Sequence, residues 1–407
     1  MTLPVSWSFQ RLDHVANLSR GKFSARPRND PRFFGGDVPF VQTGDVRNAH
    51  VHLRDFSQTL NSAGVAVSRV FPRGTMLFTI AANIGDLAFL SFDAACPDSL
   101  VAIEPKQGID ERWLFYQLTA LKAEFEAAAT QNAQLNINLE KLNPFKLPVP
   151  PFTEQQAIAA ALSDADGVVA GLERVIAKKR LIQQGAMQDL LTARRRLPGF
   201  SGEWEVKRLG DHVRFLKNGT HSRAQLSEHG PVKNLHYGDI HGAASIFLSP
   251  ATKPMPTLDL LSAGRLDRLA AGDLVFVDAS EDLAGVGTSV EVTDLGETEV
   301  VSGLHTIAAR FDKSILVDGF KAFLQFMPAF RIHLCQLAAG TKVLATNRRH
   351  ISSAEIALPR PDEQQAIATV LSDMDSEIQT LESRLTKARA VKEGMMQNLL
   401  TGRVRLV

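Results

Sequence analysis

The chain has 407 residues, of which 44% are hydrophobic and 22% are charged, and its formal net charge is +1. This length predicts two or three domains, and the composition is that of a globular protein. Because the net charge is near zero, a polyanion would have to be bound by local basic patches. Cys96 and Cys335 are isolated, which argues against a disulfide framework or a zinc site and is typical of a reducing cytosol.

The chain shows neither a signal segment at its start nor any apolar stretch near the ~20 residues that span a bilayer. We therefore expect a cytoplasmic protein that does not contact a membrane.

Residues 1–150 are expected to form a strand-rich, mixed α/β domain. Short apolar runs separated by Gly, Pro, Asn and Asp have the length and punctuation of strands. In the segment 111–129, apolar residues at helical spacing predict one helix. These residues are Trp113, Leu114, Leu118, Leu121 and Phe125.

A segment of 44 residues, 154–197, recurs at 363–406 with 23 identical positions, and both copies open Glu-Gln-Gln-Ala-Ile-Ala. A period of this size is far longer than a solenoid repeat. It indicates two similar halves, each a domain followed by one long helix. Proline-rich sequence precedes each copy, so we expect the helices to begin there, with Thr153 and Asp362 as N-caps.

Both copies carry apolar residues at alternating steps of four and three, which predicts a coiled-coil seam. The residues assigned to this seam are Ile158, Leu162, Val169, Leu172, Ile176 and Leu190 in the first copy, and Ile367, Leu371, Met374, Ile378, Leu381, Leu385 and Leu399 in the second.

Charge predicts how the two helices pair. Each copy is acidic in its first half and basic in its second, so only an antiparallel pair places acidic residues opposite basic ones. The segment Leu197-Pro198 with Trp204, which follows the first copy, reappears as Leu3-Pro4 with Trp7 at the start of the chain. The sequence therefore predicts a circular arrangement with pseudo-twofold symmetry.

The predicted organisation has four parts. Domain 1 covers residues 1–150, helix 1 covers 151–197, domain 2 covers 198–360 and helix 2 covers 361–407. The two domains share landmarks, since Gln42-Thr43-Gly44-Asp45-Val46 resembles His236-Tyr237-Gly238-Asp239-Ile240, but little between them. The duplicated scaffold with unlike surfaces predicts related tasks on different targets. The Gly-Asp pairs themselves are typical of turns.

Searches for enzymatic motifs give no match. The chain has no phosphate-binding Gly-rich loop, no HExxH motif and no His/Cys cluster at metal spacing. Residues 143–146, Asn-Pro-Phe-Lys, approach the tetrad of adenine methyltransferases but lack its second proline. These observations argue against nucleotide hydrolysis, metal chemistry and methyl transfer by this chain, and less strongly against nuclease activity.

Candidate DNA contacts are basic loops and amide-rich segments. Between Arg20 and Gly36 five basic residues face one acid, a pattern typical of phosphate binding and equally of a solvated loop. Amide side chains pair with adenine edges, although such runs more often cap turns. The candidates are Arg20, Lys22, Arg26, Arg28, Gln42, Thr43, Asn132, Gln134 and Asn136 in domain 1, and Lys217, Asn218, His221, Arg223, His236, Tyr237, Lys342, Asn347 and Arg348 in domain 2.

The paired Glu-Gln-Gln helices, the Leu-Leu-Thr runs at Leu190 and Leu399, and the Gly-Asp landmarks together resemble the specificity subunit of type I restriction–modification systems. The resemblance covers essentially the whole chain. It implies two target-recognition domains that each read half of a split double-stranded DNA sequence, with the helices as a spacer. It also implies two adenine-N6 methyltransferase subunits and restriction/translocase subunits as partners. AdoMet, ATP and Mg²⁺ would belong to those partners, with no cofactor or metal bound by this chain.

Two other functions remain open on the sequence. One is a protein-interaction scaffold whose duplicated domains bind proteins. The other is a self-sufficient DNA methyltransferase or nuclease, which the missing motifs disfavour.

Overall fold

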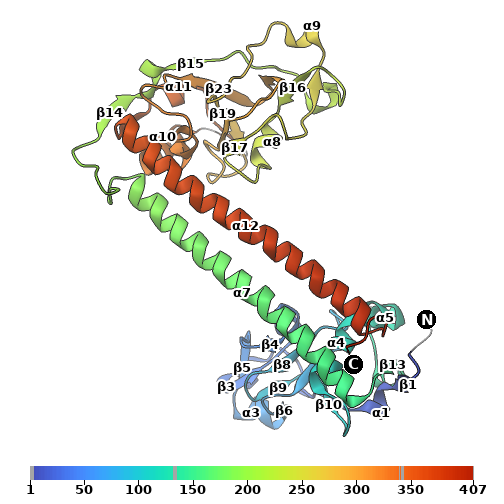
Figure 1. Ribbon diagram of the computed structural model, residues 1–407. Helices are drawn as coiled ribbons and strands as arrows, with labels where there is room; N and C mark the ends of the chain where they lie inside the picture. Colours follow the sequence, from blue (N-terminus) through green and yellow to red (C-terminus); the bar gives the residue numbers. More distant parts are fainter. Residues whose placement is uncertain (1–3, 132–134, 339, 341–342, 407) are drawn as a thin grey trace. The chain divides into compact units, whose positions relative to one another are not determined.

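The computed structural model describes residues 4–131, 135–338, 340 and 343–406. The chain folds into two compact units (Figure 1). Unit 1 contains residues 1–174 and 383–407, and unit 2 contains residues 175–382. Each unit therefore combines one domain with half of each long helix. The boundaries at residues 150, 197 and 360, which treat the helices as separate segments, stay a prediction.

Unit 1 is built on two sheets. One has the order β2 (Ala16–Arg20), β10 (Leu100–Pro105), β7 (Met76–Thr79), β8 (Leu87–Leu90) and β4 (His52–Leu53). The other has the order β5 (Gln58–Leu60), β3 (Phe34–Phe40), β9 (Ala94–Cys96) and β6 (Arg69–Phe71). Two short pairs join β1 (Ser8–Arg11) to β13 (Lys146–Val149) and β11 (Thr130–Gln131) to β12 (Leu135–Asn136).

The helices of unit 1's domain are short. They are α1 (Leu12–Val15), η1 (Pro31–Phe33), α2 (Thr43–Asn48), α3 (Ser62–Ala66), α4 (Glu111–Ala120), α5 (Lys122–Ala128) and α6 (Leu139–Leu142). The helix predicted over 111–129 is interrupted at Leu121, whose ψ of 12° leaves the helical range and starts α5 anew.

Unit 2 repeats this plan. Its larger sheet has the order β15 (Val213–Phe215), β23 (Thr306–Phe311), β19 (Leu274–Val277), β21 (Ser289–Val292) and β17 (Phe247–Leu248). Its second sheet has the order β18 (Thr257–Leu258), β16 (Val232–Leu235) and β22 (Glu299–Ser302). Its short pairs are β14 (Glu205–Arg208) with β25 (Glu355–Leu358) and β20 (Ala279–Ser280) with β24 (Leu344–Ala345).

The helices of unit 2's domain are η2 (Leu209–His212), η3 (Arg223–Gln225), α8 (Tyr237–His241), α9 (Leu260–Ala263), η4 (Lys321–Phe326), α10 (Pro328–Leu337) and α11 (Arg348–Ser352). The larger sheets match strand for strand between the units, whereas the second sheet has four strands in unit 1 and three in unit 2. For example, β4 runs parallel to β8 just as β17 runs parallel to β21. This agreement shows a duplicated mixed α/β scaffold, as the sequence predicts.

The central strands of both larger sheets are buried on both faces. All four residues of β7, β8, β19 and β21 are buried, which explains why β8 and β19 are continuous apolar runs. In β21 the alternate residues Ser289 and Glu291 are polar and nevertheless buried. In unit 1, Trp113, Tyr116 and Phe125 from α4 and α5 complete the core over the sheet.

The two long helices are α7 (Phe152–Leu190) and α12 (Pro361–Leu399), each of 39 residues. Both begin one residue before the predicted caps, so Thr153 and Asp362 lie in the first turn rather than at its edge. Pro361 suits the first helical position because its missing N–H has no partner to lose there. Both helices also end seven residues before the repeat does. At matched positions just beyond, Ala193 (φ 55°) and Gly402 (φ 72°) turn the chain in the left-handed region.

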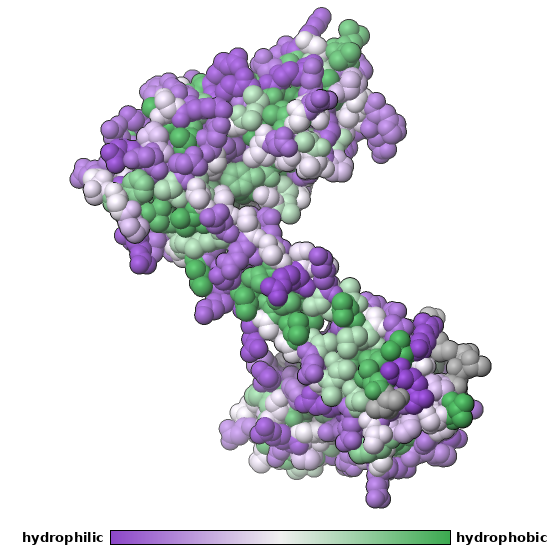
Figure 2. All heavy atoms as spheres, in the orientation of Figure 1, coloured by the Kyte–Doolittle hydropathy of each residue, from purple (hydrophilic) through white to green (hydrophobic). Residues whose placement is uncertain are grey.

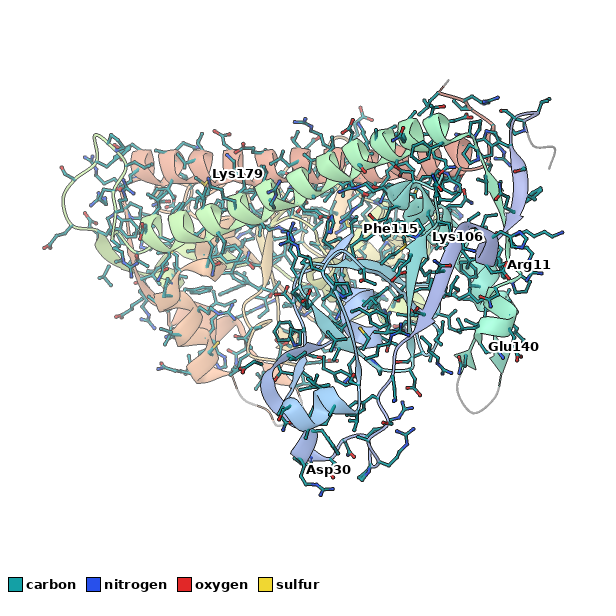
Figure 3. The ribbon with its side chains drawn as sticks, turned by 90° about the horizontal axis from the view of Figure 1, so that it is seen from below. Arg11, Asp30, Lys106, Phe115, Glu140 and Lys179 are labelled. Atoms are coloured by element: carbon teal, nitrogen blue, oxygen red, sulfur yellow. The ribbon has the colours of Figure 1, made fainter. Side chains whose placement is uncertain are left out.

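The two helices run antiparallel within each unit. In unit 1, Arg389 of α12 lies 2.6 Å from Glu173 of α7, and Lys392 lies 2.5 Å from Asp166. In unit 2, Arg180 pairs with Glu382 at the matched positions, and Lys179 lies 2.7 Å from Glu377. Lys179 is labelled on the helix pair in Figure 3. Basic second halves therefore face acidic first halves, and the antiparallel prediction is confirmed.

The residues assigned to the seam are all buried or half-buried. Ile158, Leu162, Ile176, Leu190, Ile367, Leu371, Ile378 and Leu399 are buried, and Val169, Leu172, Met374, Leu381 and Leu385 are half-buried. Burial is greatest toward the helix ends, where the domains also cover them.

A repeated clasp joins each domain to the helices. In unit 1 the buried carboxylate of Glu154 accepts hydrogen bonds from Trp7 Nε1 (2.9 Å) and from Arg405 Nε (2.8 Å) and Nη2 (2.7 Å). In unit 2 the matched Glu363 is bound through both oxygens by Arg196. The start of one helix thus holds the end of the other, in both copies.

The first glutamine of each repeat anchors its helix to its domain. Gln155 accepts the Asp110 N–H (2.8 Å) and donates to the carbonyls of Gly108 and Pro150. Gln364 makes the same three bonds, to the Val317 N–H (3.1 Å) and to the carbonyls of Ile315 and Pro359. These contacts, together with the clasp, explain physically why both copies open with Glu-Gln.

Candidate nucleic-acid interface

In unit 2 the candidate residues lie on three neighbouring loops. Lys217, Asn218, His221 and Arg223 follow β15, His236 and Tyr237 follow β16, and Asn347 and Arg348 begin α11. Arg348 Nη2 donates to the carbonyl of Leu216 (2.7 Å) and to Asn218 Oδ1 (3.1 Å). The structure therefore brings the first and third loops together.

The second loop is joined to the first by an ion pair. Arg223 Nη1 lies 3.1 Å from Asp239 Oδ1, and the guanidinium side chain stays 59% exposed. Because its outer face is open to solvent, the arginine is bonded to protein and still accessible to a ligand.

His236 is a capping residue. It is 6% exposed, its Nδ1 accepts the Gly238 N–H (3.4 Å), and its own N–H donates to Asp239 Oδ2 (3.1 Å). Burial lowers the pKa of His236, which favours the neutral ring that can accept this hydrogen bond. His236 is therefore a weaker candidate for a DNA contact than the exposed Tyr237 beside it.

The equivalent turn of unit 1 has the same construction. The Gln42 N–H donates to Asp45 Oδ2 (2.8 Å), and the Gln42 side chain donates to Gln58 Oε1 (2.6 Å). Asp45 and Asp239 thus close the first turn of α2 and α8, as the Gly-Asp landmarks suggest. Thr43 is half-buried at the position that matches Tyr237.

The basic loop of unit 1 is partly neutralised by the protein. Arg20 Nε donates to the carbonyl of Asp98 (2.6 Å), Arg28 Nη2 lies 2.7 Å from Asp98 Oδ2, and Arg26 Nη1 donates to the carbonyl of Ala25 (2.7 Å). Lys22 is exposed. The loop projects from its domain at Asp30, which binds Arg32 (Figure 3). Asp98 is a functional candidate that the sequence did not reveal, because 70 residues or more separate it from its partners.

Some of the amide side chains considered as DNA contacts cap helices, and another is exposed. Asn347 Oδ1 accepts the His350 N–H (3.1 Å) and caps α11, and Asn138 caps α6 in the same way (3.1 Å). Asn136 is exposed on β12. Asn132, Gln134 and Lys342 lie outside the described residues.

The fold adds three further residues, His241, Asp278 and His305, to the candidates of unit 2. The ring of Tyr237, 38% exposed, packs edge-on against His305 (5.5 Å between centroids) and His241 (6.3 Å). His305 Nδ1 lies 3.1 Å from Asp278 Oδ1. No sequence motif identifies these residues, because each follows or precedes a different strand.

Among the described residues, no group of three or more His, Cys, Asp or Glu side chains is placed to hold a metal ion. Within the same residues, none of the helices is both long and apolar enough to cross a membrane.

Known proteins that this chain resembles come from type I restriction–modification systems. Residues 4–179 match the family model described as the type I restriction modification DNA specificity domain. The type I restriction enzyme MjaVIII specificity subunit of Methanocaldococcus jannaschii is 24% identical over 423 residues, covering 100% of this chain and 95% of that protein.

Solved structures share the fold over the whole chain. The S subunit of a type I restriction–modification system from M. genitalium matches with a TM-score of 0.61 and 12% identity, covering 98% of both chains. A chain from a structure titled as showing complex assembly and conformational transition of the type I R-M system matches with a TM-score of 0.60 and 15% identity, over 99% of this chain and 100% of that one. The chain is therefore similar over its whole length to specificity subunits of type I restriction–modification systems, and its residues 4–179 match their DNA specificity domain.

Proposed function

We propose that this chain is the non-catalytic subunit that selects a bipartite double-stranded DNA sequence, with each unit reading one half. One observation carries the proposal. The two units repeat the same strands, clasp and glutamine anchor, while the exposed loops at matched positions carry different side chains. Two copies of one scaffold with unlike loops suit a target whose halves differ.

The loop chemistry fits a phosphate backbone with base edges beside it. In unit 2, Lys217, Arg223 and Arg348 are exposed on the same group of loops as Tyr237, and in unit 1 Lys22 and Arg28 are exposed. Cationic side chains position DNA through its phosphates, and neighbouring polar or aromatic groups read base edges. The near-zero net charge of the chain is no obstacle, because these cations are local.

Partner subunits would supply the chemistry. We infer that two adenine-N6 methyltransferase subunits and, in the cleaving complex, restriction/translocase subunits assemble on this chain in the cytoplasm. AdoMet, ATP and Mg²⁺ would be bound by those subunits. Apolar side chains reach the exposed face of the paired helices, which would suit helical partners (Figure 2). On α7, Val168, Val175 and Ile182 are exposed at seven-residue spacing, which is the spacing of a second coiled-coil seam.

A domain exchange tests the proposal. Residues 1–150 are replaced by those of another specificity subunit, and the complex with its methyltransferase subunits is expressed in a host without adenine methylation. Methylome sequencing should show one half-site replaced and the other retained. If both half-sites change, or neither, the assignment of one half-site to each unit is wrong.

A salt titration separates DNA recognition from a protein-binding scaffold. Binding of the purified complex to a duplex carrying its methylated sequence should weaken by orders of magnitude between 50 and 200 mM salt, if about six or more phosphates are contacted. Affinity that is independent of salt would favour the scaffold.

A further inference from the structure

Three loop residues of unit 2 meet where strands β16, β19 and β22 end. Tyr237 stands two residues after β16, Asp278 directly follows β19, and His305 lies in the turn between β22 and β23. The His305 ring lies edge-on to the Tyr237 ring and within hydrogen-bond distance of the Asp278 carboxylate. All three side chains are at least one-third exposed. They form one accessible cluster, which we call the Tyr–His–Asp cluster.

The backbone holds this cluster in place. His305 has φ 56°, a left-handed conformation that is uncommon for a residue other than glycine. Its carbonyl accepts the Asp278 N–H (3.2 Å), and the Asp278 carbonyl accepts the Thr346 N–H (2.8 Å). A ring that is exposed and yet fixed by its own backbone is suited to contact a ligand.

Unit 1 makes the same backbone bonds with different side chains. There the Ile80 N–H donates to the Ser99 carbonyl (3.0 Å), and the Ile80 carbonyl accepts the Ile137 N–H (2.9 Å). Ile80 therefore matches Asp278, Ser99 matches His305, and Thr43 matches Tyr237 through the common turn with Asp45 and Asp239.

The neighbouring capping positions do not differ in this way. Asp45 and Asp239 close the same turn, and Asn138 and Asn347 cap the same helix. The aspartate and the asparagine that close these turns are thus the same in both units. The accessible Tyr237, His305 and Asp278 of unit 2, in contrast, are replaced in unit 1 by the half-buried Thr43 and Ser99 and the buried Ile80. This is the arrangement required when one scaffold reads two different half-sites.

The chemistry of the cluster matches base edges. A carboxylate accepts from the amino group of cytosine, and phenol and imidazole groups offer both donors and acceptors. The flanking cations, Arg223 and Arg348, would neutralise phosphates. Resting on the proposed function, we propose that Tyr237, His305 and Asp278 select the bases of the half-site read by unit 2. At the matched places of unit 1, Thr43 and Ser99 do so, while the buried Ile80 replaces Asp278 without reaching the surface.

The test uses the full chain in complex with its methyltransferase subunits, with methylome sequencing as the readout. Y237T/H305S gives unit 2 the side chains that unit 1 has at these positions. It should change or relax at least one base of one half-site, with about a 10-fold or larger loss of discrimination there, and leave the other half-site intact. Y237F, which removes only the hydroxyl group, should cause a smaller loss at the same half-site. The matched control is L261S, an exposed position of the same unit outside the cluster, and it should retain the wild-type sequence.

The possible results are distinct. Retention of both half-sites in Y237T/H305S, with wild-type rates, overturns the inference and leaves the proposed function standing. A wild-type complex that methylates no bipartite sequence overturns both. If Y237T/H305S fails to assemble, Y237F alone decides, since a changed preference at one half-site supports the cluster and an unchanged preference overturns it.

Discussion

Each long helix begins with a buried glutamate whose carboxylate is bound by an arginine from the end of the other helix. Glu154 is fully buried, and its partners Arg405 and Trp7 come from the two ends of the chain. A buried carboxylate is costly unless it is paired and hydrogen-bonded. The clasp therefore fixes where the chain ends must lie in unit 1, as Glu363 with Arg196 fixes the junction in unit 2.

We predict that E154Q destabilises unit 1. The amide keeps the volume but loses the charge that binds Arg405, and it presents an N–H₂ group to donors. The expected loss is roughly 1–3 kcal/mol of unfolding free energy, measured by urea denaturation. E126Q, at an exposed position of the same unit, serves as control and should unfold like the wild type. Equal stability of E154Q and E126Q would show that the clasp is not stabilising.

A second buried glutamate distinguishes the units. Glu291 is 1% exposed and accepts the N–H groups of Gly319 (2.6 Å) and Ala322 (3.1 Å), near the buried Lys321. The matched residue in unit 1 is Phe89, which stacks on Phe115. Burial raises the pKa of Glu291 to about 7, although the two N–H donors and the Lys321 ammonium lower it.

This pKa predicts a pH dependence of stability. Because the folded-state value of about 7 lies above the ordinary 4.5, folding favours the protonated form. That contribution is fully present below pH 4.5 and is lost as the pH rises through 7, a difference of roughly 3 kcal/mol. We expect the difference in unfolding free energy between wild type and E291Q to change over this range. A constant difference from pH 5 to pH 8 would contradict the prediction.

At the scale of the element, the helix pair is oriented by repeated ion pairs. Arg389–Glu173 in unit 1 and Arg180–Glu382 in unit 2 occupy matched positions of the repeat. Each pair is largely exposed and so contributes little stability by itself. The ion pairs instead select the antiparallel arrangement of the helices, because a parallel pairing would place like charges opposite each other.

Charge reversal tests this role. R389E should lower the unfolding free energy by up to ~1 kcal/mol, since it sets two acids against each other. The double variant R389E/E173R restores opposite charges and should recover most of the loss in a double-mutant cycle. Additive effects of the two substitutions would show that Arg389 and Glu173 do not interact.

At the scale of the whole molecule, both helices pass from one unit into the other at matched residues, after Arg174 and at Ser383. If the helices set the unread gap of the DNA target, their length should set its number of base pairs. Seven residues inserted at both points keep the seam in register and add about 10 Å, or about three base pairs.

We therefore predict that the paired insertion lengthens the methylated sequence by about three unread base pairs, with both half-sites unchanged. Insertion of two residues, which turns the rest of each helix by about 200° and so moves the seam to another face, should abolish methylation instead. An unchanged gap in the seven-residue variant would exclude the helices as the spacer.

Much of the architecture follows from the sequence alone. A 3.5-residue period and a charge gradient, both repeated, are local patterns that determine a helix, its buried face and its partner's direction. The helix ends were less predictable, because Phe152 joins the helix before Thr153 and because Ala193 turns the chain where no glycine marks it.

Only the tertiary structure decided which loop residues form the site. Arg20 and Arg28 meet Asp98, and His305 meets Tyr237 and Asp278, across separations of 27 to 78 residues that no periodicity spans. Such contacts arise where strands of one sheet happen to end side by side, which depends on strand order rather than on local pattern. The sequence by itself thus determined the repeated helices and their antiparallel direction, because these rest on spacing and charge along the chain. The fold decided which side chains share a surface.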